Sequence, residues 1–532
     1  MTLPLWYQDA VFYELNVRAF YDGNGDGMGD LPGLLTKLDY LQTLGVDCLW
    51  LLPIYPSPLK DDGYDIADYY NIHPDYGTLD DFKALVQAVH TRGMRIITDL
   101  VLNHTSDRHP WFQAARADKN SHYRQYYVWS DSGAEYAQAR IIFSDLETSN
   151  WKWDEQAGQY YWHRFYAHQP DLNYDHPAVQ EEMLNVARFW LNLGVDGFRV
   201  DAPTYLFERE GTSCESLPET HAYLKRMRRV MDAEFPGRIF LAETNQPPRE
   251  LRQYFAEGDE FHLAFHFPLM PRLFLALAKE EAAPLRDILA ETPPIPANCQ
   301  WATFLRNHDE LTLEMVTDEE RRLLWQQYAP DPRMILNLGI RRRLAPLLDN
   351  NQRKIKLAHS LLFTLPGAPV LYYGDEIGMG ENLNLPDRNG VRTPMQWDAT
   401  ETAGFSAAAP YAPCPAGDYA PARVNVAAQI NQPDSLFSFI QHALAIRKKH
   451  RAFGRGNLRW LNTPNPAVAA FWRQTPAEKL LLLHNLSGQS QTLDLPATAR
   501  GAAHDLLTGH WLPISAALTL APYQFLWLTL ED

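Results

Sequence analysis

Three acidic residues stand at the ends of apolar runs that are typical of buried strands. Asp201 ends "LNLGVDGFRVD", Glu243 ends "RIFLAE", and Asp309 follows "WATFLRNH". In a sheet of parallel strands the carboxyl ends of the strands meet at one face, so these side chains are expected to converge there. A helix cap explains a single acid after a strand, but three of them, with Arg199 and His308 nearby, favour a catalytic site.

Paired carboxyls of this kind suit the cleavage of a glycosidic bond. That reaction needs one carboxylate at the anomeric carbon and one carboxylic acid to protonate the leaving oxygen. Arg199 precedes Asp201 by two positions, so both side chains point to the same strand face and the cation favours the ionised carboxylate. Glu243 follows two apolar residues, and a partly desolvated carboxyl keeps its proton near neutral pH. His308 and Asp309 together suit neighbouring sugar hydroxyls.

Alternating strand and helix signals surround these acids. Eight strands are predicted, at 10–17, 46–54, 94–104, 195–201, 238–243, 262–267, 301–308 and 369–373. Eight parallel strands with helical crossovers predict an α/β fold, the closed (β/α)8 TIM barrel. A helix is predicted to begin after Thr78, which forms a capping box with Asp81.

Two regions break this rhythm. From about residue 105 to 172 the chain is rich in Trp, Tyr, His and Asp and lacks a long amphipathic helix, which predicts an inserted, irregular or β-rich subdomain. Near the C-terminus, short alternating strands separated by turn residues predict an antiparallel β domain. The predicted organisation is a first barrel part over 1–104, the inserted subdomain over 105–172, a second barrel part over 173–451 with a helical excursion over about 318–348, and a C-terminal β-sandwich domain over 452–532.

Composition limits the classes of partner. The formal net charge of −17 argues against nucleic acid and anionic membranes. No apolar run reaches the length of about 18 residues that a membrane span needs, and no signal peptide is recognisable at the N-terminus. The four cysteines lack metal-binding spacing. We therefore expect a cytoplasmic protein that acts on a small molecule; a homo-oligomer is compatible with the sequence but not indicated by it.

Several motifs resemble those of the α-amylase superfamily, glycoside hydrolase family 13. "DLVLNH" (99–104), "GFRVDA" (197–202), Glu243 and "NHDE" (307–310) are similar to its four signature regions. "QPDLN" (169–173) resembles a fifth region of its oligo-1,6-glucosidase-like branch. Longer strings, including "FLRNHDELTLEMVTDEER", resemble the members of that branch that interconvert maltose and trehalose. The resemblance extends from about Trp6 to Trp397 and is weak beyond about residue 400.

The resemblance implies roles for individual residues. Asp201 is expected to be the nucleophile, Glu243 the general acid/base and Asp309 the transition-state stabiliser. Eight further residues are expected to bind the sugar, namely Tyr64, Asp65, His104, Gln169, Arg199, His308, Arg388 and Arg392.

Four of these residues are expected to shape the ends of the pocket. Asp65 and Arg388 are expected to clamp the non-reducing glucose and to close the pocket behind it, although composition alone would make them an ordinary surface ion pair. Gln169 and Arg392 are expected near the pocket mouth. A closed back wall implies exo-action on a disaccharide, and the resemblance implies intramolecular α-glucosyl transfer between maltose and trehalose, with minor hydrolysis to glucose. The alternatives are an exo-acting α-glucosidase with the same residues, and an inactive binding subunit, against which the intact acids argue.

A loop near the N-terminus has the composition of a cation site. Oxygen-bearing side chains alternate with glycines over 22–30, which is how a hard cation is held; a solvated turn is the alternative. The twelfth position is Gly33, where an EF-hand needs Glu, so an EF-hand is excluded. The resemblance implies structural Ca²⁺ on this loop, with Asp22, Asn24, Asp26, the carbonyl of Met28, and Asp30 as ligands. By analogy, a second Ca²⁺ between the inserted subdomain and the barrel would bind Asn103, Asp171, Tyr205, Leu206 and Glu208. No organic cofactor is expected.

Overall fold

The computed structural model describes residues 5–531 of the 532-residue chain. Eight parallel strands close into a barrel in the order β1-β13-β10-β9-β8-β7-β3-β2, which confirms the predicted fold class. They are β1 (Phe12–Leu15), β2 (Cys48–Leu51), β3 (Arg95–Val101), β7 (Gly197–Asp201), β8 (Ile239–Ala242), β9 (Leu263–Phe265), β10 (Gln300–Phe304) and β13 (Ala368–Tyr372). Nearly every residue of these strands is buried, as expected of a sheet covered on both faces.

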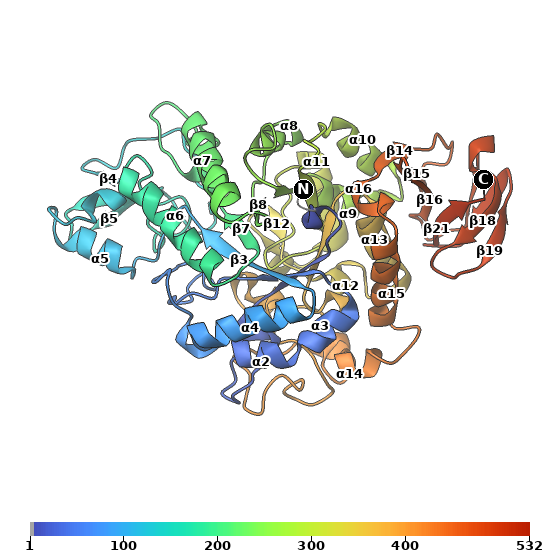
Figure 1. Ribbon diagram of the computed structural model, residues 1–532, viewed down its shortest axis with the longest axis horizontal. Helices are drawn as coiled ribbons and strands as arrows, with labels where there is room; N and C mark the ends of the chain where they lie inside the picture. The colour runs from blue at the N-terminus through green and yellow to red at the C-terminus, as the bar shows by residue number, and fades with distance from the viewer. Residues whose placement is uncertain (1–4, 532) are drawn as a thin grey trace.

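Helices lie around the barrel, and most of them connect its strands (Figure 1). They are α1 (Val17–Phe20), α2 (Leu31–Thr36), α3 (Leu38–Leu44), α4 (Leu79–Thr91), α6 (Pro177–Asn192), α7 (Pro218–Glu234), α8 (Pro248–Leu251), α9 (Leu269–Lys279), α10 (Ala283–Glu291), α11 (Asp318–Tyr328), α12 (Leu344–Leu347), α13 (Gln352–Thr364), α14 (Val426–Gln429), α15 (Leu436–Lys449) and α16 (Ala452–Arg455). The predicted capping box of α4 is present, because Thr78 and Asp81 each accept the other's backbone N–H. No helix within residues 5–531 is long and apolar enough to cross a membrane.

The segment between β3 and α6 forms a small unit at one end of the molecule (Figure 1). It contains α5 (Pro110–Ala117) and a three-stranded antiparallel sheet in the order β4-β6-β5. The strands are β4 (Trp129–Ser130), β5 (Trp151–Asp154) and β6 (Gln159–Trp162). A backbone bridge between His104 and Asp171 joins the beginning and the end of this insertion at the barrel rim.

The helical excursion predicted over 318–348 is helical only in part. After α11 the chain forms a hairpin of β11 (Ile335–Leu336) and β12 (Gly339–Ile340), and only then the short α12. Asn337 adopts a left-handed φ of 49° in the turn, a conformation that Asn tolerates better than most residues. The hairpin pairs with the loop that follows β10 through a bridge between Leu311 and Ile340.

The C-terminal domain lies at the opposite end of the molecule from the insertion (Figure 1). Its main sheet is antiparallel, with β14 (Asn457–Trp460), β15 (Val468–Thr475), β16 (Glu478–Asn485), β21 (Phe525–Leu530), β18 (Gly501–Asp505) and β19 (Trp511–Ile514) in that order. A second sheet pairs β17 (Gln491–Asp494) with β20 (Ala517–Leu520). Leu481, Leu493 and Leu520 belong to one apolar core shared by the two sheets.

Candidate active site

The backbone of β7 presents Asp201 at the barrel rim. Gly197 begins the strand at φ +149°, and a Cβ atom there would overlap the carbonyl oxygen of Ile239 on β8, so the close approach of the two strands requires glycine. Ala202, directly after Asp201, has a left-handed φ of 48°, which is uncommon for a residue with a side chain. This conformation turns the chain sharply away from the strand immediately after the carboxylate.

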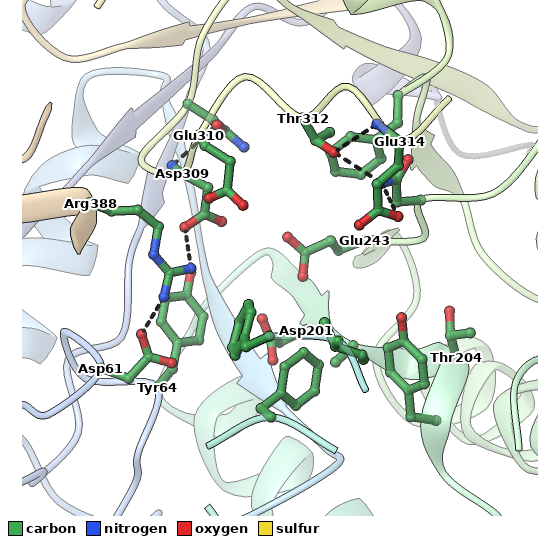
Figure 2. Close-up of a pocket in the computed structure, with 18 of the residues that line it drawn as sticks. Asp61, Tyr64, Asp201, Thr204, Glu243, Asp309, Glu310, Thr312, Glu314 and Arg388 are labelled. Carbon is green, nitrogen blue, oxygen red and sulfur yellow. Dashed lines mark hydrogen bonds and ion pairs between the residues drawn. The ribbon is translucent and has the colours of Figure 1, made fainter. Parts of the chain in front are cut away.

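Strand register places Glu243 beside Asp201. Val200 pairs with Ala242 across β7 and β8, and the N–H of Glu243 donates to the carbonyl of Val200 at 3.1 Å. Neighbouring strands lie about 4.8 Å apart. The residues that follow Val200 and Ala242, namely Asp201 and Glu243, are therefore neighbours at the rim. Asp309 comes from the loop after β10, and Figure 2 shows its carboxyl facing the same cavity as Asp201 and Glu243. The three acids predicted to converge are therefore brought together.

A buried arginine lies beneath the acids. Nη1 of Arg199 is 2.6 Å from Oδ1 of Asp201 and 2.6 Å from Oδ1 of Asp99, and Nη2 contacts Oε1 of Glu243. Burial raises the pKa of Asp99 to about 7, although Arg199 opposes the shift. One cation thus faces three carboxyl groups, an arrangement that favours a proton on one of them.

The environments of Glu243 and Asp309 push their pKa values apart. Burial raises the pKa of Glu243 well above its ordinary value, and the charges of Asp201 and Asp309 add to the effect of burial while Arg199 opposes it. Burial also raises the pKa of Asp309, but the neighbouring His308 and the guanidinium groups of Arg388 and Arg392 outweigh it and hold that pKa well below its ordinary range. One carboxyl is thereby suited to carry a proton and the other to stay ionised, the division of roles that acid-assisted glycosyl chemistry needs.

The acids line a cavity of about 170 Å³. Aromatic side chains form much of its wall, including Tyr64, Phe143 and Phe165. The Tyr64 ring stacks on the imidazole of His308 with centroids 5.4 Å apart and planes 12° apart. His104 also lines the cavity, and burial lowers its pKa. Apolar ring faces beside converging polar groups are suited to a sugar.

Asp61 and Arg388 form one wall of this cavity, and the prediction of Asp65 in the place of Asp61 is wrong. Nη2 of Arg388 lies 2.9 Å from Oδ1 of Asp61, while Nη1 lies 2.9 Å from Oδ1 of Asp309 (Figure 2). The fully buried Asp65 instead accepts hydrogen bonds from Ser57 Oγ (2.8 Å) and from the backbone N–H groups of Lys60 (3.2 Å) and Asp61 (3.1 Å). Asp65 therefore shapes the loop that presents Asp61.

Gln169 and Arg392 lie behind this wall and not at the mouth as predicted. Nε2 of Gln169 donates to Oδ2 of Asp61 at 2.9 Å, and Gln169 itself is fully buried. Arg392 donates from Nη2 to Oδ1 of Asp309 and from Nε to the carbonyl of His308, both at 2.9 Å. Like Arg199, these residues hold the side chains that line the cavity and do not line it themselves.

A polar network that the sequence did not reveal crosses the outer part of the cavity. Nδ2 of Asn245 lies 3.2 Å from Oε2 of Glu314 and 3.4 Å from Oγ1 of Thr312. Nη1 of Arg140, from the insertion, lies 3.6 Å from the same Glu314 oxygen. The network thus joins the insertion to two loops of the barrel. Asn245 follows Glu243 by two positions, which is the one signal that could have indicated it.

Oxygen atoms at the second predicted cation site lack partners. Asn103 Oδ1, Asp171 Oδ2 and Glu208 Oε1 are buried without a hydrogen-bond partner among the described residues. Burial raises the pKa of Asp171 to about 8, and burial together with the Asp171 charge raises that of Glu208 well above its ordinary value. Buried and mutually repelling carboxyls beside an amide oxygen fit a hard cation.

The predicted loop over 22–30 is held by its own hydrogen bonds. The Asp22 carboxylate accepts from the N–H groups of Asn24, Gly25 and Gly27 and from Ser406 Oγ. The Asp30 carboxylate accepts from the loop backbone and from the N–H of Gly33. Asn24 and Asp26 accept from the N–H groups two residues further on. Within residues 5–531 no group of three or more His, Cys, Asp or Glu side chains is arranged to hold a metal ion.

Comparison with known proteins defines the class to which this fold and site belong. A model described as "Alpha amylase, catalytic domain" matches residues 15–456, and one described as "Maltogenic Amylase, C-terminal domain" matches residues 458–527. The chain therefore belongs to the alpha-amylase family of enzymes.

Within that family the chain is similar to trehalose synthases. The trehalose synthase/amylase of Mycobacterium tuberculosis is 58% identical over 504 residues, covering 92% of this chain and 84% of that protein. The trehalose synthase of Pimelobacter sp. is 51% identical over 552 residues, covering 99% and 96%. Among solved structures, the isomaltulose synthase of Klebsiella sp. LX3 has a TM-score of 0.81 at 28% identity, covering 99% of this chain and 100% of that one.

Proposed function

We propose that this enzyme interconverts maltose and trehalose by intramolecular α-glucosyl transfer. The observation that carries the proposal is the Asp61–Arg388 ion pair, which forms one wall of the cavity that the three acids line and which we take as its blind end. Such a wall suits one terminal glucosyl unit and excludes the interior of a polymer. The similarity to proteins named trehalose synthase supports the choice of disaccharides.

In the first step, Asp201 attacks the anomeric carbon of the non-reducing glucose. Glu243 gives its proton to the glycosidic oxygen, the carbon–oxygen bond breaks, and a covalent glucosyl ester of Asp201 remains. Asp309, kept ionised by Arg388 and its other cations, binds hydroxyls of the glucosyl ring. The raised pKa of Glu243 supports its role as the acid, and the proximity of Glu243 to Asp201 supports retention, for which carboxyls about 5–5.5 Å apart are needed.

In the second step, the released glucose turns inside the cavity. Its anomeric hydroxyl attacks the ester, and the ionised Glu243 takes the proton, so that an α,α-1,1 bond forms and Asp201 is freed. Water attacking the same ester would give glucose, which is the minor hydrolysis that we expect. The network of Arg140, Asn245 and Glu314 over the outer cavity supports the exclusion of water during the turn.

We further propose a structural Ca²⁺ at Asn103, Asp171 and Glu208, completed by the carbonyls of Tyr205 and Leu206. The three oxygen atoms without partners support it, because a divalent cation would satisfy all of them. The ion would join the insertion to the barrel and take no part in the reaction. Ca²⁺ at the loop over 22–30 stays a prediction, since the loop carboxylates already accept several backbone hydrogen bonds.

The direct test is to incubate the enzyme with maltose and to separate trehalose from glucose in the products. Trehalose should predominate, and the same mixture should form from trehalose. The Asp201→Asn variant should lose at least about 10³-fold in turnover, as expected when a nucleophile is removed. Glucose as the only product would replace the proposal by the exo-acting α-glucosidase alternative, and unchanged turnover of Asp201→Asn would refute the assignment of the nucleophile.

A further inference from the structure

A carboxyl group of β1 that the proposed reaction does not use touches the site from inside the barrel. Glu14 is fully buried in a strand whose other members are Phe12, Tyr13 and Leu15. Within the described chain, its ion-pair contact is with His308. A buried carboxyl without a basic partner such as Arg or Lys destabilises a core, so its presence beside a site residue points to a role in the site.

One oxygen of Glu14 makes two hydrogen bonds to the same residue. Oε1 lies 3.0 Å from the backbone nitrogen of His308 and 2.5 Å from Nδ1 of its ring. Oε2 is buried without a partner among residues 5–531. Burial raises the pKa of Glu14 well above its ordinary value and lowers that of His308 well below its own, so burial favours the neutral form of both groups. A protonated Oε1 can donate to Nδ1 and still accept the backbone N–H.

The opposite side of the imidazole needs a hydrogen atom. Nε2 of His308 lies 2.9 Å from the hydroxyl of Tyr64 and 3.2 Å from Oδ2 of Asp309. The Tyr64 hydroxyl also accepts from Nη1 of Arg199 at 3.3 Å and can donate to Oδ1 of Asp99 at 3.4 Å. If Nε2 carried a lone pair, that lone pair would face the Asp309 carboxylate at close range. The network is satisfied when the neutral ring is protonated at Nε2.

We infer that Glu14 is a positioning residue, which holds His308 as a hydrogen donor at Nε2 toward Asp309 and the glucosyl hydroxyls. The inference rests on the proposed function, since it assumes that His308 and Asp309 bind the sugar. Glutamine cannot replace Glu14, because no single atom of its amide both donates to Nδ1 and accepts the backbone N–H. The Glu14→Gln variant should therefore release the ring or reverse its tautomer without changing the volume of the core.

Glu376 offers a matched control. It is also fully buried; its Oε1 accepts from Tyr13 (2.7 Å) and Tyr40 (2.6 Å), and its Oε2 has no partner among the described residues. It does not line the cavity. The measurements are kcat/KM for trehalose formation from maltose, and the melting temperature. Glu14→Gln should lower kcat/KM by about 10–100-fold, by analogy with the loss seen when a group that orients a metal-ligating histidine is removed. Glu376→Gln should change kcat/KM by less than about threefold. If the two variants melt at similar temperatures, a loss of stability does not explain the larger loss of activity in Glu14→Gln.

A double-mutant cycle separates positioning from a general structural effect. In a His308→Gln background, Glu14→Gln should have almost no further effect on kcat/KM, because the group through which it acts is gone. The inference would be overturned if the losses of kcat/KM in Glu14→Gln and His308→Gln multiply in the double variant. Equal losses of kcat/KM in Glu14→Gln and Glu376→Gln would also overturn it. If the wild-type enzyme forms no trehalose from maltose, the proposed function fails. If the wild-type enzyme forms trehalose and His308→Gln is fully active, this inference alone is overturned.

The tautomer itself can be measured without any change at Glu14. Nitrogen-15 NMR of histidine-labelled enzyme, with His308→Gln to assign the signal, should show His308 protonated at Nε2 and unprotonated at Nδ1. A signal that shows Nε2 without a proton would overturn the inference even if Glu14→Gln fails to fold.

Discussion

Arg388 and Asp61 form a partly buried ion pair with 2.9 Å between Nη2 and Oδ1, although 327 positions separate them in the chain. Asp61 belongs to the loop after β2 and Arg388 to the segment after β13, two strands that flank β1 in the barrel. Closure of the barrel therefore brings the two halves of the wall together. Gln169, from the insertion, fixes Asp61 from a third direction.

The two acids of this loop should respond differently to substitution. Asp61→Asn leaves Arg388 with one carboxylate fewer at the end of the cavity, so KM for maltose should rise at least about tenfold, in line with the cost of breaking a buried charge pair. Asp65→Asn removes an acceptor from the loop backbone, so it should lower the melting temperature while KM rises by less than about threefold. Steady-state kinetics and thermal melts check both. An Asp65→Asn variant with the larger rise in KM would contradict the placement.

Removal of the proposed acid should be most harmful for natural substrates. Glu243→Gln should lower kcat/KM for maltose by about 10²–10⁴-fold, the usual contribution of general acid catalysis. The loss should be smaller for α-glucosyl fluoride, because its leaving group needs no proton. Asp201→Asn is the control, since it should inactivate the enzyme toward both substrates. Equal losses on both substrates in Glu243→Gln would argue against this role.

The pH dependence follows from the direction of the Glu243 shift. An acid catalyst must be protonated, and the raised pKa extends the pH range over which Glu243 carries its proton. Activity should therefore persist well above the ordinary pKa of a glutamic acid and fall as pH rises through the raised value. The measurement is kcat/KM for maltose against pH. A basic limb close to the ordinary glutamate pKa would exclude Glu243 as the proton donor.

Opening the outer network should admit water. Glu314→Ala removes the oxygen shared by Asn245 and Arg140, so the ratio of glucose to trehalose formed from maltose should rise at least about threefold, while total turnover changes less. Arg188→Ala is a control, because it breaks ion pairs with Glu181 and Glu234 outside the cavity. The prediction is wrong if both variants keep the wild-type product ratio.

Chelation should make stability depend on pH. In the metal-free protein the pKa of Asp171 is raised to about 8, so its contribution to stability is complete below the unfolded-state value near 4 and is lost as pH rises through 8. Melting temperatures in a chelator should therefore fall between about pH 5 and pH 9, whereas added Ca²⁺ should remove most of that decline. Asp171→Asn should abolish the difference. Parallel pH profiles with and without Ca²⁺ would refute the site.

Gly197 should be far less replaceable than Gly93. A Cβ atom at Gly197 meets the backbone of Ile239, which cannot move without parting β7 from β8, whereas Gly93 has a positive φ of 73° but nothing within 4 Å of a Cβ. Gly197→Ala should cost about 3 kcal/mol or more and Gly93→Ala about 1 kcal/mol in free energy of unfolding. Denaturant titration measures both. Similar losses of unfolding free energy in the two variants would show that the cost at Gly197 comes from strain in φ and not from the contact with Ile239.

The sequence predicted the barrel and the meeting of the three acids because both follow from strands. Apolar runs that end in Asp201 and Glu243 have a direction and a period, and parallel pairing then places their ends together. Asp309 also follows a barrel strand, β10, and reaches the same face from the loop after it, five positions beyond the last strand residue.

The Asp61–Arg388 wall and the outer polar network lie on loops. Loop sequences have no hydrophobic periodicity that predicts which side chains point into the cavity. The string "DDGYDIAD" contains four acids, and only the fold of the loop separates Asp61 in the cavity from Asp65 beneath it. Arg140, Asn245 and Glu314 come from three segments that meet only after folding. The motif resemblance named the residues of the site more reliably than it placed them.

With the Asp61–Arg388 wall as the proposed blind end of the pocket, substrate and products share one entrance. The glucose that leaves the glycosidic bond stands between the ester on Asp201 and the solvent, so its premature escape exposes that ester to hydrolysis. After hydrolysis, the glucose bound deepest is released last, through the same entrance by which maltose binds. Free glucose should therefore compete with maltose for the deep position, which couples the hydrolytic side reaction to its own inhibition.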